Sequence, residues 1–328
     1  MAINAPVLSR DPNELIVAAR EGSRTALARL LTMIERGGEA SRKVAEISFR
    51  SEPPYSVGLT GAPGAGKSTL TDKLILAART GWPAVGERSA EALDEVSVLA
   101  IDPSSPFTGG AILGDRVRMQ DHATDPTIFI RSMATRGHLG GLSLAVPEAV
   151  RLLGAAGMPV VLIETVGVGQ MEVEVVGAAD TTVVVMNPGW GDSMQANKAG
   201  LLEIADLFVI NKADRPGVRE ARRDLEQMLD LSQLGEWRPP IVETVAQDGT
   251  GVTELWATVA EHRDYLITSG ELEIRRARRV AEALRRVIAA RLAERIETVA
   301  DGEAFQAQVD ALVEGTTDPY RAAELLLS

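Results

Sequence analysis

The sequence contains no cysteine and only three histidines, which are His122, His138 and His262. The absence of cysteine excludes disulfide bonds, thiolate metal sites and a cysteine nucleophile. Three scattered histidines also argue against a metal cage built from imidazoles. Any metal ion that this chain holds is therefore expected to be bound through oxygen ligands.

Long apolar runs are also missing. The longest runs, such as residues 159–163 and 181–186, are far too short to span a bilayer. Residues 1–10 carry neither the apolar segment of a signal peptide nor the Arg- and Ser-rich composition of a transit peptide. We therefore expect a cytoplasmic protein that has no membrane partner.

Basic residues are outnumbered: 34 Lys and Arg stand against 46 Asp and Glu, which gives a net charge of −12. Such a chain repels nucleic-acid backbones at long range, so nucleic acid is not an expected partner. One phosphate ligand held locally remains compatible with this charge. The apolar fraction of 45% is ordinary for a globular protein. A length of 328 residues suggests two domains, or one α/β domain with helical additions.

In the middle of the chain, short β-rich runs alternate with helical stretches. Several of these runs are apolar throughout, as expected for strands that are covered on both faces. The alternation predicts an α/β fold with a mostly parallel central sheet and right-handed crossovers. Functional sites in such sheets lie at the carboxyl ends of the strands. The expected strands are 55–60, 96–101, 127–131, 160–164, 181–186, 207–211 and 241–245.

Helices are predicted before and after this region of the sequence. Asp11 is a suitable N-cap and Pro12 suits the first helical position. A second helix has one apolar face, formed by Leu27, Leu30, Leu31 and Ile34. We divide the chain into N-terminal helices (1–50), an α/β domain (51–268) and a C-terminal helical arm (269–328).

The C-terminal arm combines an apolar stripe with an arginine-rich face. We interpret the arginine face as solvated or as facing an acidic partner, and the apolar stripe as a homodimer interface. The stripe comprises Ile274, Ala277, Val280, Ala281, Leu284, Val287, Ile288 and Leu292. The arginines are Arg275, Arg276, Arg278, Arg279, Arg285, Arg286, Arg291 and Arg295. A further short helix is expected to open at the Asp318-Pro319 pair.

The strongest motif is a glycine-rich segment that directly follows the first expected strand. It fits G-x-x-x-x-G-K-[ST], in which backbone N–H groups and a helix N-terminus surround phosphate oxygens. Lys67 is expected to reach the β- and γ-phosphates, and Ser68 to bind Mg²⁺. The segment reads Gly61, Ala62, Pro63, Gly64, Ala65, Gly66, Lys67, Ser68 and Thr69.

A second motif, Asn211-Lys212-Ala213-Asp214, comes directly after residues 207–210 of an expected strand. The carboxylate of Asp214 can accept hydrogen bonds from N1–H and the 2-amino group of guanine. Adenine offers no such pair of donors. Together with the P-loop, the motif predicts that Asn211, Lys212 and Asp214 select GTP over ATP.

Two acidic residues follow other expected strands. Glu164 ends the apolar strand at 160–164, where a carboxylate can meet Mg²⁺, usually through water. Gly167 follows shortly and can donate its backbone N–H to the γ-phosphate. Asp102 ends the strand at 96–101, and its carboxylate can bind Mg²⁺ or orient the attacking water. We expect Asp102 and Glu164, with Lys67 and Gly167, to be catalytic.

These motifs, taken in order, resemble the MeaB/ArgK family of P-loop GTPases. They read GAPGAGKST, DPSSPFTGGAILGDRVRM, ETVGVGQMEVEV, PGWGDSMQANKAGLLEIAD and NKAD, with DPYRAAELLL near the C-terminus. The resemblance implies GTP, GDP and Mg²⁺ as ligands and a homodimer formed through the C-terminal arm. It also implies a chaperone of an adenosylcobalamin-dependent acyl-CoA mutase, typically methylmalonyl-CoA mutase, with slow hydrolysis when the mutase is absent. A cobalamin adenosyltransferase is a further candidate partner.

The resemblance also assigns residues. Asp192, Gln195 and Lys198 fall on a switch that senses the partner in this family. The guanine-edge loop, usually S-A-x, aligns with Val245, Ala246 and Gln247, so the serine hydroxyl is missing. The backbone N–H of Ala246 can still meet O6 of guanine.

Three other functions remain as alternatives. A metal-delivery GTPase for a nickel enzyme shares the P-loop, but that role needs Cys or His ligands. A P-loop kinase for a small molecule is disfavoured by the Asn211–Asp214 motif. The third alternative is a non-catalytic scaffold that binds GTP without useful hydrolysis. It overlaps with the chaperone interpretation, because a chaperone of this kind is expected to hydrolyse GTP slowly without its partner. The sequence does not identify the mutase, nor whether the chain loads, protects or repairs it.

Overall fold

A computed structural model describes residues 10–103, 122, 124–135, 141–165, 177–189, 204–232, 235–300 and 302–327. At positions 102–103, 134–135 and 141–144 it describes the backbone alone. The chain forms two compact units, one that ends at Arg279 and one that begins at Val280. The first unit contains the N-terminal helices and the sheet, and the second contains only helices among its described residues.

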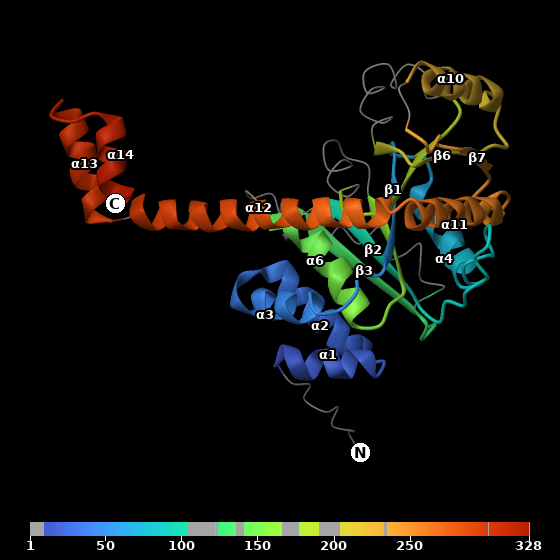
Figure 1. Cartoon of the computed structure of the whole chain (residues 1–328), viewed down its shortest axis with the longest axis horizontal. Coiled ribbons are helices and arrows are strands. Elements are labelled where there is room, and N and C mark those ends of the chain that lie inside the picture. The colour runs from blue at the N-terminus through green and yellow to red at the C-terminus, as the bar shows by residue number, and fades with distance from the viewer. Residues whose placement is uncertain are drawn as a thin grey trace. The chain divides into compact units, whose positions relative to one another are not determined.

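The first unit is built around a seven-stranded sheet in the order β3-β2-β4-β1-β5-β6-β7 (Figure 1). Neighbouring strands in this sheet all pair in parallel, which confirms the predicted fold class. The strand at the centre, β1, leads directly into the P-loop. The strands are β1 (Tyr55–Thr60), β2 (Val96–Pro103), β3 (Ile128–Thr135), β4 (Val160–Thr165), β5 (Thr181–Met186), β6 (Leu207–Asn211) and β7 (Ile241–Thr244).

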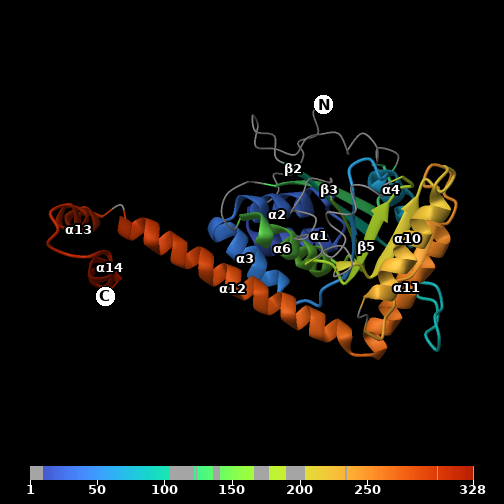
Figure 2. The ribbon, with the colours of Figure 1, turned by 90° about the horizontal axis from the view of Figure 1, so that it is seen from above.

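Helices cover both faces of the sheet (Figures 1 and 2). One apolar core joins the strands to α4 and α11, and a second joins them to α1, α2, α3 and α6. A third, smaller core lies between α10 and strands β5 and β6. Strands β1, β4, β5 and β6 are therefore buried along their whole length. The helices are α1 (Pro12–Arg20), α2 (Arg24–Arg36), α3 (Gly38–Ser48), α4 (Lys67–Ala78), α6 (Gly141–Ala155), α10 (Val218–Leu231) and α11 (Val252–Thr268).

The N-terminal helices form as their capping and spacing predict. The side chain of Asp11 caps α1 by accepting a hydrogen bond from the backbone N–H of Asn13 at 3.1 Å. The apolar face expected for the second helix is buried in α2, where Leu30 and Leu31 are fully enclosed. These helices pack onto α6, so their burial stabilises one face of the sheet.

The arginine face of α12 (Glu271–Ala300) is not wholly solvated, which corrects part of our interpretation. Arg276 and Arg279 both donate to the carboxylate of Asp180, which is 1% exposed. Arg275 pairs with Asp206 at 2.8 Å. A charge run with helical spacing has the same sequence signature whether it meets water or buried carboxylates, so the pattern alone could not separate these cases.

The two carboxylates of this cluster precede β5 and β6 at the amino end of the sheet. Burial raises the pKa of Asp180, but hydrogen bonds and the charges of Arg276 and Arg279 outweigh burial and lower it. Burial likewise raises the pKa of Asp206, and here the bond from His262 and the charges of His262 and Arg275 lower it. The start of α12 is therefore joined to the sheet by charge-assisted hydrogen bonds.

Removing the charge of Asp180 is expected to destabilise the protein strongly. Asp180→Asn leaves two partly buried arginines without a counter-ion, which costs about 3 kcal/mol in the free energy of unfolding. The matched control is Asp230→Asn, because Asp230 pairs with Arg238 on the surface and both side chains are more than half exposed. The control is expected to lose less than about 1 kcal/mol. Urea denaturation measures both values, and equal losses would contradict the argument.

The contribution of Asp180 also has a defined pH dependence. Because the folded pKa lies below the unfolded value, the stabilisation is complete above that unfolded value and is lost as the pH falls through the folded pKa. The stability difference between wild type and Asp180→Asn is therefore expected to stay constant above about pH 5 and to shrink below about pH 4.

The second unit holds the rest of α12, α13 (Glu303–Val313) and α14 (Pro319–Leu327). The last helix begins at Pro319, as the Asp318-Pro319 pair predicts, and Asp318 accepts from the backbone N–H of Tyr320 at 3.0 Å. Several apolar side chains of α12 are exposed, among them Leu284 (59%), Ile288 (50%) and Leu292 (56%). Across the part of the chain that the structure describes, no helix is both long and apolar enough to cross a membrane.

Candidate functional site

The P-loop joins β1 to α4 at the carboxyl end of the central strand. Two of its glycines leave no room for a side chain. A Cβ at Gly61 would lie 1.9 Å from the carbonyl oxygen of Val185, and one at Gly66 would lie 2.4 Å from Nδ2 of Asn211. Both residues have positive φ angles, 137° and 93°, which favour glycine. The loop therefore packs tightly against β5 and against the residue that begins the guanine motif.

The phosphate end of the site brings together Lys67, Ser68 and Glu164, as the sequence predicts. Lys67 is the first residue of α4, is 5% exposed, and donates from Nζ to the carbonyl oxygens of Gly61 (2.5 Å) and Ala62 (3.1 Å). Ser68 Oγ donates to Glu164 Oε1 at 2.5 Å. A hydroxyl and a buried carboxylate in contact at a helix N-terminus are oxygen ligands of the kind that Mg²⁺ prefers, so the residues fit that ion.

The guanine end is organised around Asn211, which is 2% exposed. Its Nδ2 donates to the carbonyl of Ala65 in the P-loop at 2.8 Å. Its Oδ1 accepts from the backbone N–H of Ala246 and from Thr244 Oγ1, both at 3.1 Å. The side chain of Asn211 thus ties β6 to the P-loop on one side and to the loop after β7 on the other. The backbone N–H of Ala246, which the sequence predicts to meet O6 of guanine, thus donates to Asn211 in this structure.

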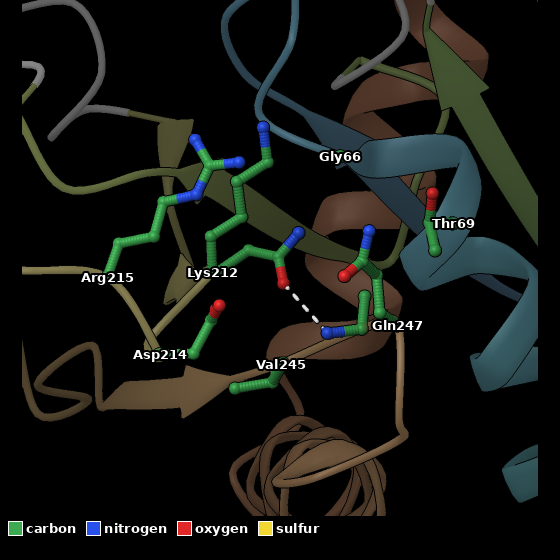
Figure 3. A pocket seen from close by; sticks show the side chains of 9 residues that line it. Gly66, Thr69, Lys212, Asp214, Arg215, Val245 and Gln247 are labelled. Atoms are coloured by element: carbon green, nitrogen blue, oxygen red, sulfur yellow. Dashed lines mark hydrogen bonds between the residues drawn. The ribbon is translucent and has the colours of Figure 1, made fainter.

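A pocket lies between these loops, and Figure 3 shows its walls. Lys212 has a φ of 60° and extends along one wall, where its Nζ donates to the carbonyl of Gly64 at 2.6 Å. Asp214 is exposed at the rim. The residues predicted for base recognition are thereby brought to one pocket. It is lined by Gly66, Thr69, Asn211, Lys212, Asp214, Arg215, Val245, Ala246 and Gln247.

Several predicted site residues lie outside the described part of the chain. One of them is Gly167, which is expected to contact the γ-phosphate. The others are the residues expected to form the partner-sensing switch, Asp192, Gln195 and Lys198. Asp102 is described by its backbone alone, at the end of β2. The residue before it, Ile101, pairs with Thr165 at the end of β4, so the Asp102 backbone lies at the same edge of the sheet as Glu164.

Sequence reasoning missed two residues of this site. Thr244 is fully buried and holds Asn211 in place, and Arg215 lines the pocket directly after Asp214. A threonine at the end of a β-rich run gives no distinctive signal. Arg215 adjoins the N-K-x-D pattern but is not part of it, so only its position in the pocket distinguishes it from a surface arginine.

The chain is similar to known GTPases over most of its length. A family model described as "Methylmalonyl Co-A mutase-associated GTPase MeaB" matches residues 27–301. A putative GTPase of Pyrococcus abyssi is 47% identical over 321 residues, which cover 96% of this chain and 95% of that protein. The mouse protein named methylmalonic aciduria type A homolog, mitochondrial, is 33% identical over 94% of this chain and 76% of its own length.

The fold has a solved counterpart as well. The crystal structure titled LAO/AO transport system kinase superposes with a TM-score of 0.68 and 27% identity, and the match covers 98% of each chain. The parallel sheet and the P-loop agree with this likeness. The pocket that brings together the residues of the guanine motif agrees with it as well. The matched family model spans more than half of the chain, and the chain therefore belongs to the MeaB family and is a guanine-nucleotide-binding P-loop GTPase of the MeaB/ArgK type.

Proposed function

We infer that this GTPase is a nucleotide-gated chaperone of an adenosylcobalamin-dependent acyl-CoA mutase, with methylmalonyl-CoA mutase as the first candidate. The observation that carries the proposal is the matched family model, whose description names association with that mutase. The name of the mouse relative refers to methylmalonic aciduria, which supports a client enzyme that acts on methylmalonyl compounds. In this role GTP binding and hydrolysis gate cofactor loading and protect or reactivate the mutase.

At the phosphate end, Lys67 and the P-loop from Gly61 to Thr69 are proposed to hold the triphosphate. The N-terminus of α4 is proposed to direct the backbone N–H groups of its first turn and its partial positive charge at the phosphates. Ser68, Glu164 and Asp102 are the proposed Mg²⁺ residues. When bound, this ion neutralises charge that develops on the transferring phosphoryl group. Asp102 is also proposed to orient the attacking water.

At the other end, Asp214 is proposed to accept from N1–H and the 2-amino group of guanine. Asn211 positions the loop that carries Ala246, and the aliphatic stem of Lys212 provides a flat wall for the base. Val245 and Gln247 complete the rim of the pocket. Two hydrogen bonds support this assignment, one that Asn211 donates to Ala65 and one that it accepts from Ala246, because they join the base-reading and phosphate-binding loops directly.

Coupling between nucleotide and mutase is the direct test of the chaperone role. Mutase affinity, measured by calorimetry, is expected to differ between GDP and a non-hydrolysable GTP analogue. By reciprocity, the mutase must change nucleotide affinity by the same factor. The double variant Gln195→Ala with Lys198→Ala is expected to keep GTP binding and to lose the distinction, because both residues fall on the expected switch.

Turnover provides the second readout for this proposal. The mutase is expected to accelerate GTP hydrolysis by the wild type, since intrinsic hydrolysis is slow without the partner. If the mutase binds equally in both nucleotide states and leaves the hydrolysis rate unchanged, the chaperone role is wrong. The protein would then be a GTPase whose partner is not this mutase.

We further propose a homodimer formed through the C-terminal arm, because α12 exposes an apolar stripe that a second copy can cover. The full-length double variant Leu284→Glu with Ile288→Glu is expected to sediment as a monomer, whereas the wild type sediments as a dimer. Leu231→Glu is the matched control, since Leu231 is 88% exposed on α10, outside the arm. A dimeric double variant would place the interface elsewhere.

A further inference from the structure

Arg215 occupies a defined position in the nucleotide pocket. It lines the same pocket as Asn211, Lys212 and Asp214 and lies in the short turn between β6 and α10. The backbone N–H of Arg215 donates to the carbonyl of Lys212 at 3.0 Å, which closes the turn. Pro216 follows and restricts the backbone of Arg215 to few conformations. The direction in which this arginine leaves the chain is therefore set by local structure.

The turn leads directly into α10. Gly217 is the N-cap residue of α10 and has a φ of 96°, a left-handed conformation that favours glycine. The segment that presents Arg215 is thus held by its hydrogen bond to Lys212 on one side and by the start of α10 on the other. Its backbone is therefore ordered before a ligand binds, so the backbone adds little entropy cost to binding.

The electrostatic surroundings of Arg215 differ from those of its neighbours. Arg222, on the following helix, pairs with Glu243 at 2.6 Å. Arg215 is exposed and forms no side-chain hydrogen bond or ion pair with any residue in the described ranges. Its side chain and that of Lys212 both line the pocket, and Figure 3 draws both.

Two cations that line one pocket repel each other when no anion is present. Lys212 donates to the carbonyl of Gly64, which is a neutral acceptor, so that bond does not neutralise either charge. Asp214 is the one carboxylate among the described residues that line the pocket. In a chain with a net charge of −12, this wall is a local concentration of positive charge next to the P-loop. It suits a polyanion that extends from the pocket toward Gly64.

We propose that Arg215 contributes to nucleotide affinity by electrostatic attraction of the phosphates of the bound guanine nucleotide. The proposal rests on the assignment of this pocket to the guanine nucleotide. Its charge acts with that of Lys212 on the diphosphate portion, while Asp214 and Asn211 recognise the base. The interaction distinguishes nucleotides from the nucleoside rather than guanine from adenine.

Calorimetric affinities for guanosine, GDP and GTP test this assignment in the full-length protein. Arg215→Ala is expected to weaken GDP and GTP binding about three- to tenfold, because it removes one partly solvated charge near a polyphosphate. Guanosine binding is expected to change less than about twofold, since the nucleoside carries no phosphate. Arg215→Lys keeps the charge and is expected to retain most of the affinity. The loss in Arg215→Ala should shrink as salt increases.

Arg219→Ala is the matched control. Arg219 is also exposed, lies four residues further along in α10, and is not among the described residues that line the pocket. If Arg215→Ala loses no more GDP affinity than Arg219→Ala, the effect is one of net charge and the proposal is wrong. An equal loss for guanosine and GDP would also overturn it, because Arg215 would then support the base. Neither measurement uses the mutase, so failure here is distinct from failure of the chaperone role.

Discussion

Lys67→Ala is expected to lower the rate of GTP hydrolysis by about three orders of magnitude. Lys67 is 5% exposed at the N-terminus of α4, so its charge acts in a site from which water is largely excluded. It is held by the carbonyls of Gly61 and Ala62, within the loop that surrounds the phosphates. Removing it withdraws preorganised charge from the transferring γ-phosphoryl group, and the transition state loses more stabilisation than bound GTP does.

Single-turnover hydrolysis, with nucleotide affinity measured separately, distinguishes a loss of chemistry from a loss of binding. Lys73→Ala is the matched control because Lys73 lies on the same helix and pairs with Asp72 on its surface. The control is expected to hydrolyse GTP at the wild-type rate. Wild-type turnover in Lys67→Ala would show that the P-loop assignment is wrong. A folded state in the variant is checked by its denaturation midpoint.

The second large effect concerns the choice of base. Asp214→Asn is expected to weaken GTP binding by about 10²–10⁴, because two charge-assisted hydrogen bonds of roughly 1.5–3 kcal/mol each are lost. The amide can instead donate to the 2-oxo group of xanthine, so affinity for xanthosine triphosphate is expected to rise. Asp214 is exposed at the rim of the pocket, so the substitution is not expected to disturb the core.

Asp224→Asn is the control for this experiment, because Asp224 is exposed on α10 and is not among the described residues of the pocket wall. It is expected to leave the preference for GTP unchanged. Equal affinity of the wild type for ATP and GTP would refute the role of Asp214. A loss of GTP affinity without any gain for xanthosine triphosphate would show that Asp214 shapes the pocket rather than contacting the base.

Local sequence patterns were enough to predict the parallel sheet and to single out the residues proposed for the nucleotide site. The runs at 55–60 and 181–186 form strands with those bounds, because short β-rich segments with few polar residues are typical of strands that are buried on both faces of a parallel sheet. The motif places a helix directly after its glycines, and α4 begins at Lys67, within the motif itself. Information of this kind lies within a few consecutive residues and needs no knowledge of distant contacts.

Which distant groups meet depends instead on how the elements pack together. Arg276 and Asp180 are 96 residues apart in sequence, and their pairing changes part of a charged helix face into an attachment to the sheet. Trp82 stacks on Trp256 with ring centroids 4.4 Å apart, a contact that no local pattern indicates. The presence of Arg215 in the same pocket as Lys212 and Val245 depends on the turn between β6 and α10 and on the pairing of β6 with β7. Charge and apolarity are visible in a sequence, but the group that compensates each charge is chosen by the packing of separate elements.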